Sequence, residues 1–322
     1  MIPVRVAVIG AGQFGRNHIR VVGQSHRCRL VAVIDPNQSS AEEALTAAAI
    51  GDCAIYPALS AFDGRVDAAV IATPTALHSE IACSLMESGV DILVEKPIAS
   101  SLAEAGRMTD TARANNRILQ VGHLERFNPA VTALRQAVTL PLFFEIHRLN
   151  LFSPRCLDVD VILDLMIHDI DIVLDLVGSE PDDIHAAGVS ILSPKVDIAN
   201  VRLQFPGGCI ANLTASRVST ERVRKVRLFQ PHEYISLDYT RQHAVRFRVN
   251  ESRQISFAEL PVAKDEPLRL QWESFLDSVT TRNRPQADGA AGLRALALAE
   301  SIIAKIEVHR SQVEQSLRSA GF

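Results

Sequence analysis

The sequence has few cysteines, few aromatic residues and no long apolar runs, and each scarcity excludes a class of protein. None of the five cysteines in the 322 residues belongs to a Cys-x-x-Cys pair, which excludes zinc-ribbon and dithiol redox sites. Aromatic residues make up 5%, and no basic–aromatic repeat of a nucleic-acid binder is present. No apolar run is long enough to span a bilayer, and no signal peptide precedes the first strand. We expect a cytoplasmic protein with reduced thiols.

Neither positive nor negative charge is in large excess. The formal net charge is −4, and charged residues are 22% of the chain. The densest positive cluster is Arg222-Val223-Arg224-Lys225, which we interpret as a solvated strand end. Hydrophobic residues are 47%, enough for two domains with apolar cores.

The pattern of predicted helices and strands changes near residue 122. Strand-like and helix-like segments alternate to about residue 122, which predicts a doubly wound parallel sheet of the Rossmann type. Beyond that point alternating segments dominate and predict an α+β domain with a large, mostly antiparallel open sheet covered by helices on one face. We expect an α/β protein with a Rossmann domain over residues 1–124 and a second, α+β domain over 125–322.

The turn Gly10-Ala11-Gly12-Gln13-Phe14-Gly15 follows the strand Val4–Ile9 and opens a helix. This is the setting that a dinucleotide-binding turn requires. Gly10 permits the tight turn, Gly12 lets a pyrophosphate approach the backbone, and Gly15 lets the helix pack against the strand. The helix N-terminus, with Gln13 and Phe14, offers N–H groups to phosphate.

Asp35 ends the second strand and completes this motif. Its carboxylate is expected to accept hydrogen bonds from the adenosine ribose hydroxyls. A 2′-phosphate would meet a like charge there, and the following Pro36 offers no side-chain donor. The sequence therefore predicts NAD rather than NADP as the cofactor.

Two further strand ends carry polar residues that we assign to the cofactor site. One is the turn from Thr73 and Pro74 to His78, which alternatively is only a proline-initiated helix start. The other is Glu95-Lys96-Pro97, where Pro97 restricts Lys96 to an extended backbone directed toward the cofactor. Taken alone, Lys96 is better explained as an ordinary surface lysine at a strand end.

An apolar helix predicted over Val159–Val177 contains Asp164 and His168, four residues apart and so on one face. The pair is either a proton relay, in which His168 takes a substrate proton and Asp164 orients it, or a buried pair that satisfies itself. No third ligand supports a metal site, so none is predicted.

Together, the glycine turn, Glu95-Lys96-Pro97, the Asp164-x-x-x-His168 helix and the antiparallel second domain resemble the glucose–fructose oxidoreductase, inositol dehydrogenase and rhizopine-catabolism protein family. The resemblance covers nearly the whole chain. It implies that Lys96, Asp164 and His168 form the catalytic group of a sugar dehydrogenase, with Lys96 or His168 as the base. It also implies a homodimer or homotetramer through the open sheet.

The segment from Gly122 to Pro129 resembles the branch of this family that oxidises the 3-hydroxyl of UDP-N-acetylglucosamine. Those enzymes supply a partner aminotransferase in the synthesis of lipid A or surface polysaccharide. A nucleotide-sugar needs cations for its diphosphate and amides for its sugar. Besides the catalytic group, we expect substrate contacts from residues near the domain junction: His123, Glu125, Arg126, Asn128 and Arg155. Arg148 is a weaker candidate.

Two alternatives stay open. One is another dehydrogenase of the family, acting on UDP-N-acetylglucosaminuronate or on a polyol such as inositol. The other is a non-enzymatic NAD-sensing regulator, like the galactose-pathway repressor of yeasts, which shares the expected fold. The intact Lys96, Asp164 and His168 argue against the regulator.

Overall fold

The computed structural model of the chain describes residues 3–62, 64–152 and 159–319, which fold as two units. The first unit runs to Leu124 and includes a returning segment, Glu266–Leu293. The second comprises Glu125–Asp265 and the chain from Arg294 onward. The return of Glu266–Leu293 to the first unit was not part of the prediction.

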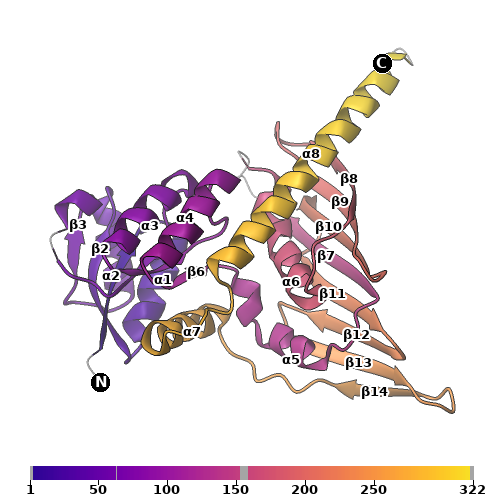
Figure 1. Cartoon of the computed structure of the whole chain (residues 1–322), viewed down its shortest axis with the longest axis horizontal. Helices are drawn as coiled ribbons and strands as arrows, with labels where there is room; N and C mark the ends of the chain where they lie inside the picture. Colours follow the sequence, from indigo (N-terminus) through magenta and orange to yellow (C-terminus); the bar gives the residue numbers. More distant parts are fainter. Residues whose placement is uncertain (1–2, 63, 153–158, 320–322) are drawn as a thin grey trace. The chain divides into compact units, whose positions relative to one another are not determined.

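The first unit contains a six-stranded sheet in the order β3-β2-β1-β4-β5-β6, and every neighbouring pair is parallel (Figure 1). Its central strands are buried along almost their whole length, as expected where helices cover both faces. This confirms the predicted Rossmann fold. The strands are β1 (Val4–Ile9), β2 (Cys28–Ile34), β3 (Ala54–Tyr56), β4 (Ala68–Ile71), β5 (Asp91–Val94) and β6 (Leu119–Val121).

Helices α2 and α4 of the first unit begin at polar caps, and α7 begins at a proline. Asn37 caps α2 by accepting a hydrogen bond from the backbone N–H of Ser40, and Ser101 caps α4 in the same way. The returning helix α7 buries Trp272 and Phe275 in the apolar cluster that also contains Ile19 of α1. The elements are α1 (Gln13–Gln24), α2 (Gln38–Ala47), η1 (Leu59–Ala61), η2 (Thr75–Leu77), α3 (His78–Glu87), α4 (Leu102–Ala114) and α7 (Pro267–Thr281).

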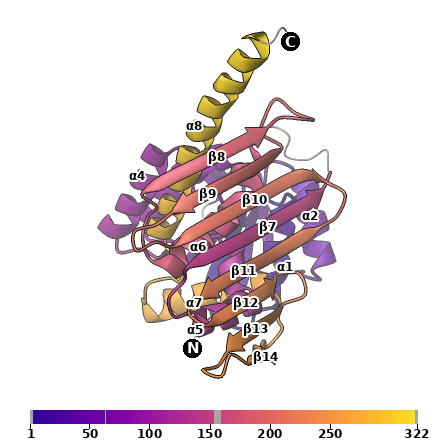
Figure 2. The same cartoon turned by 90° about the vertical axis from the view of Figure 1, so that its right-hand side faces the viewer.

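The second unit contains an eight-stranded sheet in the order β14-β13-β12-β11-β7-β10-β9-β8 (Figure 2). Only β7 and β10 pair in parallel, so the predicted mostly antiparallel sheet is confirmed. Gly207 and Gly208, both with positive φ, make the turn between β9 and β10. The strands are β7 (Phe143–Leu151), β8 (Asp183–Val189), β9 (Ile198–Gln204), β10 (Ile210–Ser219), β11 (Val223–Gln230), β12 (Glu233–Asp238), β13 (His243–Val249) and β14 (Ile255–Glu259).

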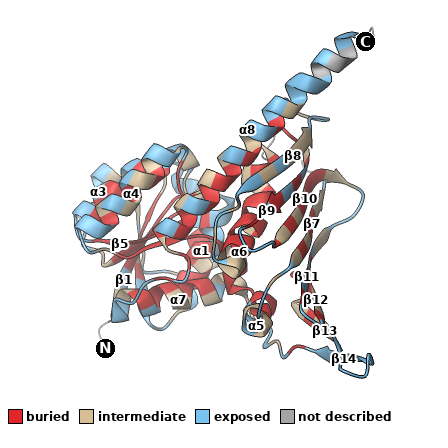
Figure 3. Cartoon of the chain, turned by 45° about the vertical axis from the view of Figure 1, so that its right-hand side comes forward, coloured by how far each residue is buried: buried red, intermediate tan, exposed pale blue. Residues whose placement is uncertain are grey.

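Helices cover one face of this sheet, and buried residues concentrate on that face (Figure 3). The inward side chains of the strands, such as Phe144 and Ile146, join those of the helices in one apolar core. The strands alternate buried and exposed positions, most regularly in β9. The helices are η3 (Leu124–Phe127), α5 (Pro129–Ala137), the π-helical turn η4 (Ile162–Met166), α6 (Ile167–Val177) and α8 (Gly289–Ser319).

The described thiols are free: Cys28, Cys83 and Cys209 are buried, and Cys53 is partly exposed. Burial raises the pKa of the Cys209 thiol to about 11, which keeps it protonated and unreactive at neutral pH. Over the described part of the chain, no helix is long and apolar enough to cross a membrane.

Candidate active site

The glycine turn has the geometry that a bound pyrophosphate requires. Gly10 has a φ of +96°, and a Cβ there would lie 2.5 Å from the carbonyl oxygen of Ala72. A Cβ on Gly15 would lie 1.9 Å from the carbonyl oxygen of Gly10, so helix α1 packs directly on the turn. A Cβ on Gly12 would meet nothing within 4 Å, which leaves open space beside the backbone. The turn therefore fits a dinucleotide phosphate at the N-terminus of α1.

The two residues after Gly12 are exposed at the start of this helix. Gln13 is its first residue, and the Phe14 side chain is 56% exposed. The cap residue, Gly12, has no side chain to bond the first N–H groups of α1. Those N–H groups therefore face outward, where a phosphate can accept from them.

Asp35 is joined to the same turn. Its Oδ2 accepts a hydrogen bond from the backbone N–H of Ala11 at 2.5 Å, and its Oδ1 accepts from that of Asn37 at 2.8 Å. The carboxylate is half-buried, and Pro36 beside it is exposed. This arrangement fits the ribose of NAD, because the carboxylate stands at the carboxyl end of β2 beside the phosphate-binding turn.

The His78 ring connects the loops that follow β4 and β5. Its Nε2 lies 3.0 Å from the carbonyl oxygen of Thr73, and its Nδ1 lies 3.1 Å from that of Pro97. Burial lowers the pKa of His78, although the two carbonyls and the Glu95 charge oppose this effect. The His78 ring therefore lies between the Thr73–Pro74 turn and the loop after Glu95, while Pro74 itself is exposed.

Glu95 anchors the loop that carries Lys96. Its Oε1 lies 2.7 Å from Nε2 of the buried His18, and its Oε2 accepts from the backbone N–H of Lys96 at 3.2 Å. Burial opposes ionisation of Glu95, but the hydrogen bond with His18 and the nearby positive charges leave its pKa below the ordinary value. A Cβ on Gly122 would lie 2.9 Å from this carboxylate, so only glycine fits there without a shift. The Lys96–Pro97 peptide bond is cis, and Lys96 is half-buried.

His123 follows β6 directly and is buried. It stands at the same carboxyl edge of the parallel sheet as the turns after β1, β4 and β5. The first unit thus places Gly10, Asp35, Thr73, Lys96 and His123 at consecutive strand ends, as the sequence predicted from the topology.

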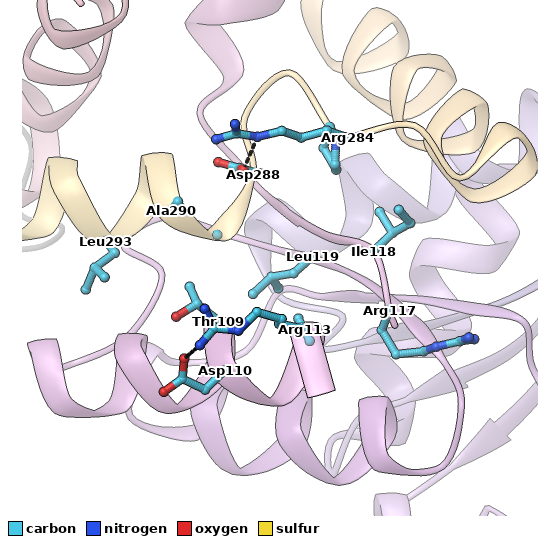
Figure 4. Close-up of a pocket in the computed structure, with 13 residues that line it drawn as sticks. Thr109, Asp110, Arg113, Arg117, Ile118, Leu119, Arg284, Asp288, Ala290 and Leu293 are labelled. Carbon is cyan, nitrogen blue, oxygen red and sulfur yellow. Dashed lines mark hydrogen bonds and ion pairs between the residues drawn. The ribbon is translucent and has the colours of Figure 1, made fainter. Parts of the chain in front are cut away.

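A separate hollow of about 400 Å³ lies near the start of β6, away from the carboxyl ends of the strands (Figure 4). It is lined by the end of α4, by Ile118 and Leu119 at the start of β6, and by residues 284–293. Four of its charged side chains pair with one another, Arg284 with Asp288 and Arg113 with Asp110. None of the predicted site residues lines it, so we do not assign the reaction to this hollow.

In the second unit, Asp164 and His168 lie on one continuous helix, as predicted. Asp164 belongs to the π-helical turn η4, and His168 is the second residue of α6. Both side chains are half-buried. π-helical turns are rare and occur frequently at functional sites. Because Lys96 belongs to the first unit, the assignment of all three as one catalytic group stays a prediction.

The predicted substrate residues Arg126 and Asn128 are buried among partners within the second unit. Arg126 donates two hydrogen bonds of 2.7 Å to Asp171 and one of 2.8 Å to Asp175. Asn128 caps α5 through the backbone N–H of Ala130. These contacts join η3 to α6 and start α5 at Asn128, and the role of both residues in substrate binding stays a prediction.

Arg148 forms a second buried ion network. Its guanidinium donates hydrogen bonds of 2.7 and 2.8 Å to Asp169 and one of 3.0 Å to Glu125. Tyr239 lies below it with the ring centroid 4.9 Å away and donates its hydroxyl to Asp169 at 3.2 Å. Burial disfavours the charged guanidinium, but the two carboxylates raise the pKa of Arg148 well above its ordinary value.

Sequence reasoning missed Asp169, Asp171 and Tyr239. The available signal was a set of aspartates on a helix otherwise predicted to be apolar, because a buried carboxylate needs a cationic partner. Asp169 is adjacent to His168 in the chain, so the Arg148 network fixes the helix turn that presents His168. Arg155, also predicted to contact substrate, lies outside the described residues.

Comparison with known proteins agrees with this geometry. The family model described as "Oxidoreductase family, NAD-binding Rossmann fold" matches residues 4–123, and that described as "GFO/IDH/MocA C-terminal domain" matches residues 152–230. UDP-N-acetylglucosamine 3-dehydrogenase of Acidithiobacillus ferrooxidans is 36% identical over 95% of this chain and 98% of its own. A solved structure of that enzyme has a TM-score of 0.89 and covers 96% of this chain and 99% of its own.

More distant relatives share the fold. The scyllo-inositol 2-dehydrogenase (NAD(+)) of Bacillus subtilis is 28% identical over 67% of this chain and 68% of its own. A levoglucosan dehydrogenase solved with NADH and levoglucosan has a TM-score of 0.85 at 18% identity, covering 95% of this chain and 97% of its own, and shows the fold alone. The match along both units and the glycine turn built for a dinucleotide lead to one conclusion: the chain belongs to the GFO/IDH/MocA family of NAD-binding oxidoreductases.

Proposed function

We propose that this enzyme uses NAD⁺ to oxidise the 3-hydroxyl of UDP-N-acetylglucosamine to the 3-keto sugar. The observation that carries the proposal is the similarity to the Acidithiobacillus ferrooxidans enzyme, which extends over nearly the full length of both chains. The Rossmann unit binds the cofactor, and the second unit carries the candidate proton-transfer pair Asp164 and His168.

The proposed chemistry assigns one task to each residue. NAD⁺, when bound, supplies the acceptor for the hydride that leaves the sugar carbon. His168 takes the hydroxyl proton as general base, and Asp164 orients the imidazole. The Lys96 ammonium stabilises the negative charge that develops on the sugar oxygen. Glu95 and His18 hold the loop from which Lys96 extends.

The test is NADH formation, followed by absorbance, with UDP-N-acetylglucosamine as substrate. Because the equilibrium of alcohol oxidation can be unfavourable, an aminotransferase and an amino donor are added to remove the ketone. We expect His168→Ala to lower kcat by about 10²- to 10⁴-fold. NADH affinity, measured by fluorescence titration, should stay unchanged. Turnover of His168→Ala at the wild-type rate would refute the assignment of the base.

The same assay separates the alternatives. Free N-acetylglucosamine, inositol and UDP-N-acetylglucosaminuronate are offered at equal concentration. Faster oxidation of inositol than of UDP-N-acetylglucosamine would identify a polyol, and not a nucleotide-sugar, as the substrate. No oxidation of any of these compounds, together with NAD-dependent binding of another protein, would favour the regulator.

The product suggests the place of this step. A 3-keto nucleotide-sugar is the substrate that a transaminating enzyme needs to form a 3-amino sugar. We therefore place the enzyme in the cytoplasm, ahead of an aminotransferase that supplies lipid A or surface polysaccharide synthesis.

We also propose that the uncovered face of the eight-stranded sheet joins copies of this chain. Ring contacts between neighbouring strands join five side chains in a line across this sheet. We call this line the aromatic row: Phe143, Phe229, Tyr234, Phe247 and Phe257. Phe229 is 39% exposed and Phe257 is 59% exposed. Aromatic residues are enriched in protein interfaces and costly to leave in water.

Light scattering after gel filtration tests this interface. We expect a dimer or tetramer for the wild type, and a smaller species for Phe229→Glu, because the substitution buries a charge in the interface. Val308→Glu, an exposed position on α8, is the matched control and should leave the mass unchanged. An unchanged mass for Phe229→Glu would refute the proposed interface.

A further inference from the structure

The second unit holds an arginine that the predicted site does not include. Two buried arginines of this unit are neutralised: Arg126 bonds Asp171 and Asp175, and Arg148 bonds Asp169 and Glu125. Each carboxylate is therefore committed to a guanidinium. Arg224 of β11 has no such arrangement.

Arg224 stands directly opposite Arg148 in the pairing of β11 with β7. On the other side of β7, the residue that pairs with Arg148 is Ala215 of β10. Arg224 alternates with the exposed Lys225 and shares the inward side of β11 with the buried Val226, so its side chain belongs to the helix-covered side. Like charges directly opposite each other on one sheet face are destabilising, so the pair needs compensation.

Within the described ranges, no carboxylate forms an ion pair with Arg224. The Arg224 guanidinium has no ion pair or hydrogen bond to a described residue, and its Nε is buried without a hydrogen-bond partner there. Glu125 and Asp169 are near enough to raise the pKa of Arg224. Burial, Arg148 and Arg222 outweigh them, and the pKa falls to about 10.

A cation held in this way is suited to an anionic ligand. A guanidinium offers several N–H donors in one plane and binds phosphate oxygens with two parallel hydrogen bonds. Arg222 lies two residues earlier in the chain and is exposed, so a second guanidinium is available beside the first.

We infer that Arg224, assisted by Arg222, binds the diphosphate of the nucleotide-sugar substrate. The inference rests on the proposed function and names the group that recognises the nucleotide part. It also gives the cluster Arg222–Lys225 a role other than a solvated strand end, because alternation along β11 places Lys225 on the opposite side of the strand from Arg224.

The experiment measures UDP binding to the full chain, saturated with NADH, by titration calorimetry. We expect Arg224→Gln to weaken UDP about 10- to 100-fold, the loss typical of a charge-assisted pair. Lys225→Gln, the next residue on the opposite face of the strand, is the matched control and should bind UDP like the wild type. NADH affinity should be equal in all three proteins.

Thermal melting adds a reading that a purely structural arginine would not give. Because Arg224 faces Arg148 without a carboxylate, Arg224→Gln should melt at the wild-type temperature or above it. Wild-type affinity of a folded Arg224→Gln for UDP would overturn the inference. If Arg224→Gln does not fold, Arg224→Lys decides, since a lysine keeps the charge but loses the bidentate geometry. Wild-type UDP affinity of that variant would then overturn the inference.

The outcome is separable from that of the proposed function. If the wild type oxidises UDP-N-acetylglucosamine and Arg224→Gln keeps its kcat/KM, the inference fails and the function stands. If the wild type does not oxidise that compound but binds inorganic diphosphate through Arg224, the function fails and the anion site stands.

Discussion

Replacing Asp169 by asparagine tests whether the buried Arg148 network stabilises the second unit. The change keeps the size of the side chain but removes the charge that accepts two hydrogen bonds from Arg148 and one from Tyr239. Arg148 is 1% exposed, so water cannot replace the lost partner. Only Glu125, at 3.0 Å, would remain to neutralise the guanidinium.

The expected loss follows from this burial. Removing one partner of a buried ion pair costs about 3–5 kcal/mol of the free energy of unfolding. For a unit of this size, 1 kcal/mol lowers Tm by about 2–4 °C, so we expect a decrease of roughly 6–20 °C. A more exposed pair in the same sheet provides the contrast, Glu145 of β7 with Arg227 of β11 at 2.8 Å. Glu145→Gln should cost less than about 1 kcal/mol.

Two probes distinguish the units in this experiment. Far-UV circular dichroism follows the whole chain during urea denaturation. The fluorescence of Trp272, the single tryptophan, reports on the first unit, in whose core it is buried. Asp169→Asn should shift the dichroism transition to lower urea, while the native fluorescence shows that the first unit stays folded. Equal losses for Asp169→Asn and Glu145→Gln would refute the reasoning.

Three further predictions concern the first unit. Gly12→Ala should keep its Tm but lose NADH binding in a fluorescence titration, whereas Gly15→Ala should lower both, since its Cβ would lie 1.9 Å from a backbone oxygen. Asp35→Asn should shift the ratio of kcat/KM toward NADP by about tenfold or more, because the charge that repels a 2′-phosphate is gone; an unchanged ratio would contradict this role. Burial lowers the pKa of His78 below its ordinary 6.5, so the unfolded chain takes up the proton first and stability falls as pH drops from 6.5 through the folded pKa. His78→Gln should therefore lose less stability over that interval, measured by melting at a series of pH values, and an equal acid sensitivity would exclude His78 as a cause.

Much of the fold was predictable because it depends on local patterns. The strand β1 and the turn after it carry β-branched residues and glycines whose spacing has one common structural meaning. The missed strands had weak signals: β3 spans three residues, and every residue of β14 is exposed. Without a buried face, a strand has no strong hydrophobic alternation to reveal it.

The return of α7 to the first unit was not predictable from its sequence. An amphipathic helix shows which of its faces is apolar, and Trp272 and Phe275 satisfy that pattern. The pattern does not state which core receives the face. That choice depends on the shape of a surface built by residues far away in the chain.

The sequence by itself determined that this protein binds a dinucleotide, because the glycine turn and Asp35 act through backbone geometry within a short segment. It also determined that a domain with a parallel sheet comes first in the chain and a domain with a mostly antiparallel sheet follows, through the periodicity of apolar residues. Only the tertiary structure decided which charged residues neutralise one another. Arg126, Arg148 and Arg224 are alike in sequence, but carboxylates from α6 reach the first two and not the third. Pairing between side chains distant in the chain depends on packing, and packing is a property of the folded units.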